Sequence, residues 1–169
     1  MIKPKNEVPD LKIPLTNGTN WHLKSQKSET FTLIVFYRGL HCPKCKQQLE
    51  ELTKRLEDFV ERGINLVAIS CDKKERAEKV VQDWEISELP IGYGLSIDQA
   101  KDWGLFISEK ISEKEPDQFS EPGIFLIRPD YTLYASSIQT MPFARPHWDH
   151  LLNALDYIVK NDYPARGSA

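Results

Sequence analysis

Two cysteines stand three positions apart in the stretch Phe-Tyr-Arg-Gly-Leu-His-Cys-Pro-Lys-Cys, which covers residues 36–45. A thiolate is both a nucleophile and a metal ligand, so this spacing suits dithiol redox chemistry and also half of a zinc site. Cysteines at i and i+3 on one helical face can close a disulfide with little movement. Cys42 and Cys45 are therefore the candidate catalytic pair.

The residues around the pair predict a strand before it and a helix after it. Residues 31–37 form a β-branched and aromatic run typical of a buried strand, and apolar residues recur at helical spacing from Leu49 to Val60. Pro43 suits the first helical position because that position needs no amide hydrogen, which leaves Cys42 at or near the cap. There the orphan amides and the helix dipole favour a thiolate. A Cys-x-x-Cys at a strand-to-helix junction indicates a dithiol redox site.

A zinc site is the alternative interpretation of the cysteine pair. Further ligands are available in His41, Cys71, His147 and His150. However, a structural zinc site commonly uses a second closely spaced pair, and the sequence has no second Cys-x-x-Cys. We therefore expect redox chemistry with neither a metal nor another cofactor. Cys71, which closes an apolar run, is interpreted as a small buried hydrophobe rather than a third redox cysteine.

Length and composition predict a single domain over residues 1–169. The chain is 40% hydrophobic and 28% charged with a formal net charge of −3, and this mild acidity without a Lys/Arg cluster speaks against nucleic-acid binding. Neither the apolar stretch of a signal peptide nor the ~18 apolar residues of a membrane span occurs. A Cys-x-x-Cys with one further cysteine suits the reducing cytoplasm, where such pairs are catalytic.

Patterning along the chain predicts alternating strands and helices. The expected elements are a β-hairpin around Asn17-Gly18, a strand at 64–70, a helix at 73–84, a short strand and helix within 89–106, an antiparallel hairpin of strands at 124–127 and 132–136, and a helix at 146–160. Strand, helix, strand order around the cysteine pair argues for parallel pairing through a right-handed crossover. The charged segment 108–120 is expected to be a solvated insertion. Pro142 and Pro146 are expected to stiffen the loop before the last helix.

At residues 36–45 the sequence resembles the thioredoxin superfamily and, within it, the peroxiredoxin-like AhpC/TSA family with its Arg-Gly-x-x-Cys-Pro-x-Cys signature. The resemblance implies an α/β thioredoxin-like fold: a central mixed β-sheet flanked by helices, with an N-terminal β-hairpin. It also implies a thiol peroxidase or dithiol-disulfide oxidoreductase. Its substrate would be a hydroperoxide or a disulfide, and its reductant a thiol, either thioredoxin-like or glutathione. The oligomeric state is left open.

The resemblance does not settle which sulfur attacks. A true peroxiredoxin carries Pro-x-x-x-Thr-x-x-Cys, and without gaps these residues fall on Arg38, Cys42 and Cys45. On the basis of this match, we expect Cys45 to be the attacking sulfur and Cys42 its resolving partner. In thioredoxins the first cysteine attacks, and the electrostatics of a helix start also favour Cys42. Arg38 and His41 are supporting candidates, since a nearby cation lowers the pKa of a thiol.

Pro122 occupies the position where the thioredoxin superfamily keeps a cis-proline facing the cysteines, so the resemblance implies a cis bond between Glu121 and Pro122. The arginine with which true peroxiredoxins polarise the peroxide is missing, because Pro122 and Gly123 occupy that region. Hydroperoxide reduction is the preferred interpretation, and disulfide reduction is the alternative. A non-catalytic binding module that has kept the fold is a third hypothesis, against which the intact cysteine pair argues.

Overall fold

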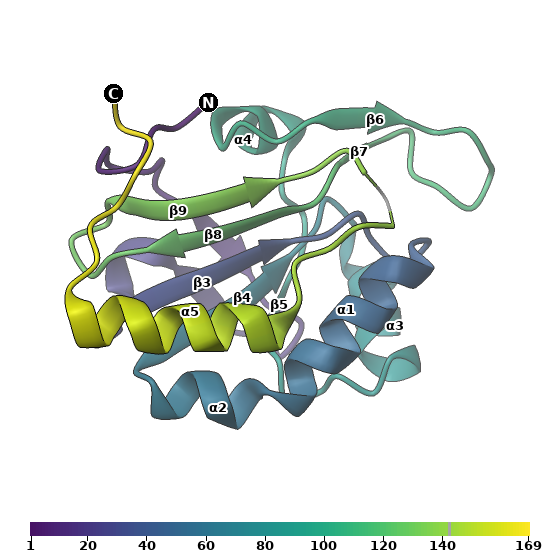
Figure 1. Cartoon of the computed structure of the whole chain (residues 1–169). Helices are drawn as coiled ribbons and strands as arrows, with labels where there is room; N and C mark the ends of the chain where they lie inside the picture. The colour runs from purple at the N-terminus through teal and green to yellow at the C-terminus, as the bar shows by residue number, and fades with distance from the viewer. Residues whose placement is uncertain (142) are drawn as a thin grey trace.

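A five-stranded mixed sheet forms the centre of the fold (Figure 1). In the order in which they pair, its strands are β5 (Ile91–Gly92), β4 (Ile64–Ile69), β3 (Phe31–Phe36), β8 (Gly123–Ile127) and β9 (Leu133–Ile138). β3 pairs with β4 in parallel, whereas β3–β8 and β8–β9 are antiparallel. The computed structural model describes residues 1–141 and 143–169, and Pro142 lies outside the described residues. The predicted mixed sheet, parallel crossover and β8–β9 hairpin are confirmed.

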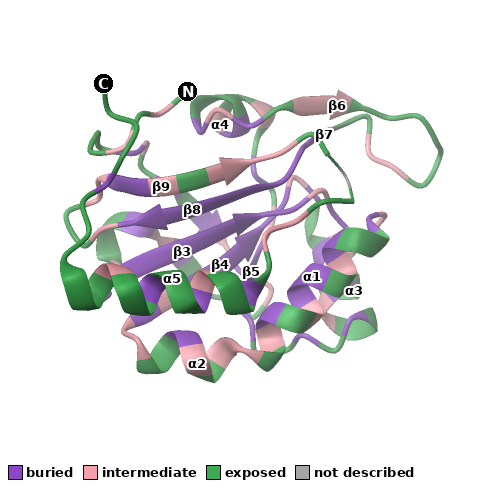
Figure 2. Cartoon of the chain, in the orientation of Figure 1, coloured by how far each residue is buried: buried purple, intermediate pink, exposed green. Residues whose placement is uncertain are grey.

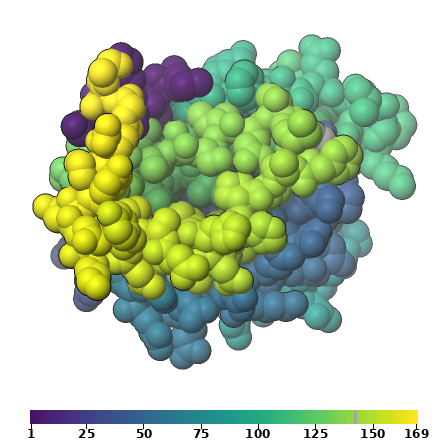
Figure 3. All heavy atoms as spheres, viewed as in Figure 1, coloured from purple at the N-terminus to yellow at the C-terminus, as the bar shows by residue number. Residues whose placement is uncertain are grey.

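Helices cover both faces of this sheet. One face carries α1 (Pro43–Lys54), α2 (Leu56–Glu61), α3 (Lys74–Asp83) and α5 (Trp148–Asn161), and the other carries α4 (Ile97–Asp102) with the N-terminal hairpin. Successive strand residues point to opposite faces, so Leu33 and Val35 join the first core, whereas Ile34 and Phe36 join the second. Burial on both faces explains why β3 is a continuous apolar run. Figure 2 shows the central strands buried beneath helices whose outer surfaces are exposed, and Figure 3 shows α5 and the C-terminal segment lying over one face.

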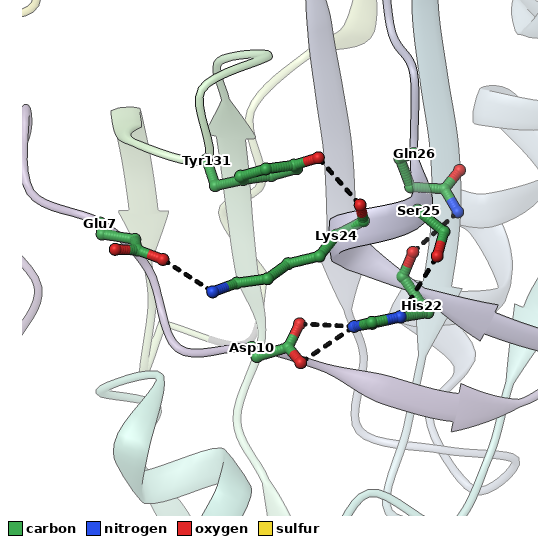
Figure 4. Close-up of polar contacts among 7 residues, drawn as sticks. All are labelled: Glu7, Asp10, His22, Lys24, Ser25, Gln26 and Tyr131. Carbon is green, nitrogen blue, oxygen red and sulfur yellow. Dashed lines mark hydrogen bonds and ion pairs between the residues drawn. The ribbon is translucent and has the colours of Figure 1, made fainter.

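The N-terminal hairpin predicted from Asn17-Gly18 is confirmed. It consists of β1 (Lys12–Pro14) and β2 (Asn20–His22), which pair antiparallel and lead into a 3-10 helix, Leu23–Ser25. Polar contacts hold it in place (Figure 4): Glu7 pairs with the Lys24 ammonium at 2.9 Å, and the Tyr131 hydroxyl donates to the Lys24 carbonyl at 2.9 Å. The hairpin is thereby attached to the turn between β8 and β9.

The helix after the cysteine pair is broken, contrary to the single helical face expected from Leu49 to Val60. Arg55 separates α1 from α2 with φ −107° and ψ 5°, and its guanidinium makes two hydrogen bonds to the Asp149 carboxylate at 2.6 and 3.2 Å. In α2, Phe59 is buried whereas Val60 is 58% exposed. The ion pair to α5 therefore accompanies a change of helix direction that local periodicity does not reveal.

The charged segment 108–120 is an insertion with a structured base. Its ends form the antiparallel strands β6 (Ile107–Glu109) and β7 (Gln118–Ser120). Residues 109–114 are exposed, as expected, but Phe119 and Ser120 are buried. Within the described residues, no helix is long and apolar enough to cross a membrane.

Trp148 joins α5 to α1, and its loss should destabilise the fold. The indole is 3% exposed, its Nε1 donates to the Gln48 carbonyl at 2.8 Å, and its ring lies edge-on to Phe59. We predict that Trp148→Ala lowers the free energy of unfolding by about 3–5 kcal/mol, because it leaves a cavity in the core. Urea unfolding followed by far-UV circular dichroism measures this change.

The matched control is Val159→Ala, on the same helix at a side chain that is 59% exposed. The sequence places Val159 on the apolar side of the helix, but the structure exposes it, so truncation should change the free energy of unfolding by less than about 0.5 kcal/mol. Equal losses for the two variants would contradict this account of the packing.

Candidate redox site

Cys42 and Cys45 form a disulfide at the start of α1, with their Cα atoms 5.2 Å apart. Cys42 is the N-cap residue and Pro43 is the first helical residue, as the sequence predicts. The Sγ of Cys42 accepts a hydrogen bond from the backbone N–H of Cys45 at 3.1 Å. Both residues are nearly inaccessible, with exposed fractions of 2% for Cys42 and 0% for Cys45. The Cys42 sulfur therefore occupies the position where a helix start stabilises an anion.

A buried carboxylate shapes the redox loop, which is the segment 37–41 between β3 and the disulfide. Asp72 follows β4, is 1% exposed, and accepts hydrogen bonds from the Leu40 amide and from Nε of Arg76, each at 2.7 Å. Gly39 has a φ of +129°, and a Cβ there would lie 2.6 Å from Oδ2 of Asp72. Only glycine meets both the conformational and the steric requirement. Asp72 thus fixes the path of the chain toward Cys42.

Arg38 is paired with carboxylates instead of lying free in solvent. Its Nε is 3.4 Å from Oε1 of Glu121, and its Nη2 is 3.8 Å from Oε1 of Glu115. The guanidinium also lies over the Phe119 ring, 4.9 Å from the centroid. Glu121 accepts a further hydrogen bond from the Ser108 hydroxyl at 2.6 Å. The positive charge of Arg38 is therefore compensated by its neighbours on and beside the β6–β7 hairpin.

His41 is half-buried between α3 and the β6–β7 hairpin. Its ring contacts Phe119 at a centroid distance of 4.6 Å, and its Nδ1 lies 3.4 Å from Nη2 of Arg76. Burial, and next the charge of Arg38, lower the pKa of His41 below its ordinary value of 6.5. The imidazole is therefore neutral at pH 7, so it can act as a hydrogen-bonding group but not as the cation considered from the sequence.

Cys71 is a free cysteine at the end of β4. It is half-buried and packs against the core beneath the N-terminal hairpin. Burial raises the pKa of its thiol, which keeps the sulfur protonated and unreactive at neutral pH. These features fit its interpretation as a small hydrophobe.

The prediction of a cis bond before Pro122 is wrong. The described residues contain no cis peptide bond, so Glu121–Pro122 is trans. The Glu121 amide donates to the Phe106 carbonyl and the Pro122 carbonyl accepts from the Gln139 amide, so the chain already runs extended into β8. Pairing of Gly123 with Phe36 places Pro122 beside the end of β3, where the loop to Cys42 begins.

The loop before α5 borders the site. Arg145 is half-buried, and its electrostatic partners include Glu121 and Arg38. It lines a surface pocket of about 180 Å³ together with Lys44 and Gln48 of α1. No three His, Cys, Asp or Glu side chains within residues 1–141 and 143–169 gather as a metal site would require, and His147 and His150 contact each other, with ring centroids 5.5 Å apart.

Three residues that organise the site, Asp72, Arg76 and Phe119, are not singled out from the sequence. Asp72 and Arg76 stand at i and i+4 at the start of a predicted helix, which is the spacing of a helical ion pair. Phe119 is the one aromatic residue in the charged segment 108–120. The i, i+4 spacing and the single aromatic residue are visible in the sequence, but neither feature predicts which loop these side chains contact.

Replacing Gly39 should destabilise the redox loop. We predict that Gly39→Ala lowers the free energy of unfolding by more than about 2 kcal/mol, because it adds a contact with Asp72 to the strain of a positive φ. Gly18→Ala is the matched control, since Gly18 has a φ of +86° but a Cβ added there would meet nothing within 4 Å. It should lose only about 1 kcal/mol in the same urea titration. A Gly39→Ala loss no larger than that of Gly18→Ala would show that Asp72 does not constrain the loop.

Oxidation should link Cys42 to Cys45 without help from Cys71. We expect mass spectrometry of the oxidised, non-reduced protein to find the Cys42–Cys45 bridge, and Cys71→Ser to form it equally well. A dominant bridge that involves Cys71 would contradict the prediction.

Comparisons with known proteins agree with this architecture. The chain is 22% identical over 161 residues to the 1-Cys peroxiredoxin of Medicago truncatula, a match that spans 90% of this chain and 71% of that protein. It superposes on peroxidoxin BcpB from Mycobacterium tuberculosis with a TM-score of 0.75 at 19% identity, over 94% of this chain and 99% of the other. For a yeast mitochondrial 1-Cys peroxiredoxin, the TM-score is 0.77 at 16% identity, over 96% and 78%.

These likenesses establish an α/β thioredoxin-like fold of the peroxiredoxin type. The family model described as "AhpC/TSA family" matches residues 4–136, which is most of the sequence. The chain belongs to the AhpC/TSA family.

Proposed function

We propose that this protein is a thiol-dependent hydroperoxide reductase whose Cys42–Cys45 pair cycles between dithiol and disulfide. The observation that carries the proposal is the position of both sulfurs in the first turn of α1, close enough to be joined. Membership of the AhpC/TSA family and likeness to proteins named as peroxiredoxins support a hydroperoxide as the substrate.

The reaction runs through a sulfenic acid. A thiolate attacks one oxygen of the hydroperoxide, the O–O bond breaks, and the departing alkoxide or hydroxide takes up a proton. Sulfur is oxidised by two electrons and keeps the oxygen as a sulfenic acid. The second thiol then attacks that sulfur, releases water and closes the disulfide. An external dithiol, or two molecules of a monothiol, returns two electrons through a mixed disulfide, restores the dithiol and leaves as a disulfide.

We assign the attack to Cys42 and the resolving step to Cys45. Cys42 is at the N-cap and already accepts the Cys45 N–H, and both features favour its thiolate. Both cysteines belong to the same apolar core, so the position of Cys42 at the helix start, rather than a difference in burial, separates the two roles. The pattern of true peroxiredoxins assigns the roles the other way round, and that assignment is the competing prediction in the experiment below.

Burial favours a hydroperoxide over a protein disulfide as the substrate. The exposed fractions of the two cysteines are 2% and 0%, which leaves little room for the flanking chain of another protein to reach a sulfur. A small hydroperoxide needs a smaller opening. Disulfide reduction is retained as the second candidate because the same pair at a helix start would also support a mixed disulfide.

The reductant is proposed to be a thiol of the thioredoxin or glutathione class. The yeast mitochondrial 1-Cys peroxiredoxin, which shares this fold, resolves its thiol through glutathione and thioredoxin systems. A reducing compartment such as the cytoplasm would supply such thiols and return the pair to its active form. Addition of each reductant to the oxidised protein, with thiol release as the readout, would separate the two.

Single serine variants test both the reaction and the roles. We predict that Cys45→Ser, which keeps Cys42, forms a dimedone-trappable sulfenic acid with hydrogen peroxide, whereas Cys42→Ser does not. Cys71→Ser is the control and should match the wild type in stopped-flow thiol loss with hydrogen peroxide and with cumene hydroperoxide.

The opposite trapping pattern would assign the attack to Cys45 and leave the peroxidase proposal intact. If neither the wild type nor the variants react faster than free cysteine with either hydroperoxide, the proposal is wrong. Reduction of insulin disulfides by the same samples would then favour the reductase. Inactivity in both assays would favour a binding module.

A further inference from the structure

Arg76 connects three parts of the site through one guanidinium. Its Nε donates to Asp72 at 2.7 Å, while its Nη2 lies 3.4 Å from Nδ1 of His41 and donates to the Lys114 carbonyl at 3.2 Å. A guanidinium has only donors, so Nδ1 of His41 must be the acceptor in this contact. The proton of the neutral imidazole is therefore on Nε2.

The position of Arg76 is itself held by a buried group. Asp72 is 1% exposed and also accepts the Leu40 amide, next to His41 in the chain. Arg76 therefore cannot turn away from His41 without leaving Asp72 short of a partner inside the protein. On its other side, the imidazole contacts the Phe119 ring, so two contacts orient His41.

The Nε2–H of His41 has no acceptor in the described protein. Nε2 is buried and makes no hydrogen bond among the described residues, which is unusual for a polar atom in a native fold. The charged groups around the ring are Arg38, Asp72, Glu115 and Arg76. Burial and the two arginines lower the pKa of His41, whereas the two carboxylates raise it, and the net shift is downward. His41 thus supplies an oriented, neutral donor directly before Cys42 in the chain.

We propose that His41 Nε2–H donates a hydrogen bond to the anion that forms at the dithiol, and that Arg76 and Asp72 are positioning residues that fix its tautomer. The acceptor is the thiolate in the reduced protein and the departing oxygen during attack. The histidine keeps its proton throughout, so the electron balance of the reaction is unchanged. This inference rests on the proposed function only where it concerns the departing oxygen.

The first measurement reports the tautomer without any substrate. Long-range ¹H–¹⁵N correlation spectra of the reduced protein at pH 7.5 should show His41 with an unprotonated Nδ1 and a protonated Nε2. In Arg76→Gln, the preference of the imidazole proton for Nε2 over Nδ1 should weaken. A wild-type His41 that carries its proton on Nδ1 would overturn the inference.

The second measurement reports how His41 affects the pKa and the reactivity of the attacking thiol. A neutral donor stabilises a thiolate, so His41→Phe should raise the pKa of the attacking cysteine, followed by thiolate absorbance at 240 nm. The rate constant with hydrogen peroxide should fall about tenfold, as for loss of one hydrogen bond to a charged group. Phenylalanine keeps a ring against Phe119, which limits damage to packing.

The role of Arg76 is tested by non-additivity. Arg76→Gln and Arg76→Lys should both reproduce the direction of the His41→Phe effect, because neither side chain bridges Asp72 and His41 as the guanidinium does. Adding Arg76→Gln to His41→Phe should cause little further change. Lys79→Gln is the matched control, since it removes a positive charge from the exposed face of α3 and should leave thiol pKa and rate unchanged.

Additive effects of Arg76→Gln and His41→Phe, or an unchanged thiol pKa in His41→Phe, would overturn the inference. Near-ultraviolet circular dichroism of each variant checks that the fold is kept, and an unfolded Arg76→Gln is replaced in the cycle by Arg76→Lys. If the wild type does not react with peroxide, the proposed function fails, while the tautomer and the thiol pKa still decide whether His41 acts on the sulfur.

Discussion

Parallel pairing of β3 with β4 is the constraint on which the site depends. Their register joins Phe36 to Ile69, so the loops after both strands leave the sheet at the same edge. One loop leads to Cys42, the other carries Asp72, and the Leu40 amide donates to Asp72 across this edge. Because Asp72 is buried, removing one of its partners would leave its charge less well compensated inside the protein. The path of the redox loop thus follows from sheet topology and one carboxylate.

The parts of this architecture that local chemistry determines could be predicted from the sequence. The apolar run 31–36, the fixed φ of Pro43 and the Asn17-Gly18 turn each specify their own conformation, and each has the predicted structure. The position of Cys42 at the cap follows in the same way, since a strand and a proline define where the helix can begin. The candidate cysteines were accessible to prediction because their spacing is itself the signal.

Features set by contacts between distant segments could not be predicted in this way. The break at Arg55 coincides with an ion pair to Asp149, 94 positions away, and Arg38 meets Glu115 only because the β6–β7 hairpin folds back over the loop. The trans bond at Pro122 belongs to the same class, because hydrogen bonds to segments around Phe106 and Gln139 hold the chain there. Hydrophobic periodicity describes one helix or strand at a time and gives no information about ion pairs and hydrogen bonds between distant segments.

The charges of the site are arranged to suit an anion that exists only part of the time. In the oxidised form there is no thiolate, so an uncompensated cation near the sulfurs would be left buried and poorly solvated. Arg38 avoids this because Glu121 and Glu115 pair with it, and Arg76 avoids it because Asp72 does. Stabilisation of a transient anion then falls to neutral donors, namely the amides at the start of α1 and the imidazole of His41, because an unpaired neutral donor costs less than a buried unpaired charge when the anion is absent. A chain without an arginine at Pro122 can therefore still favour a thiolate, because oriented N–H dipoles at the helix start supply the field that a buried cation would otherwise provide.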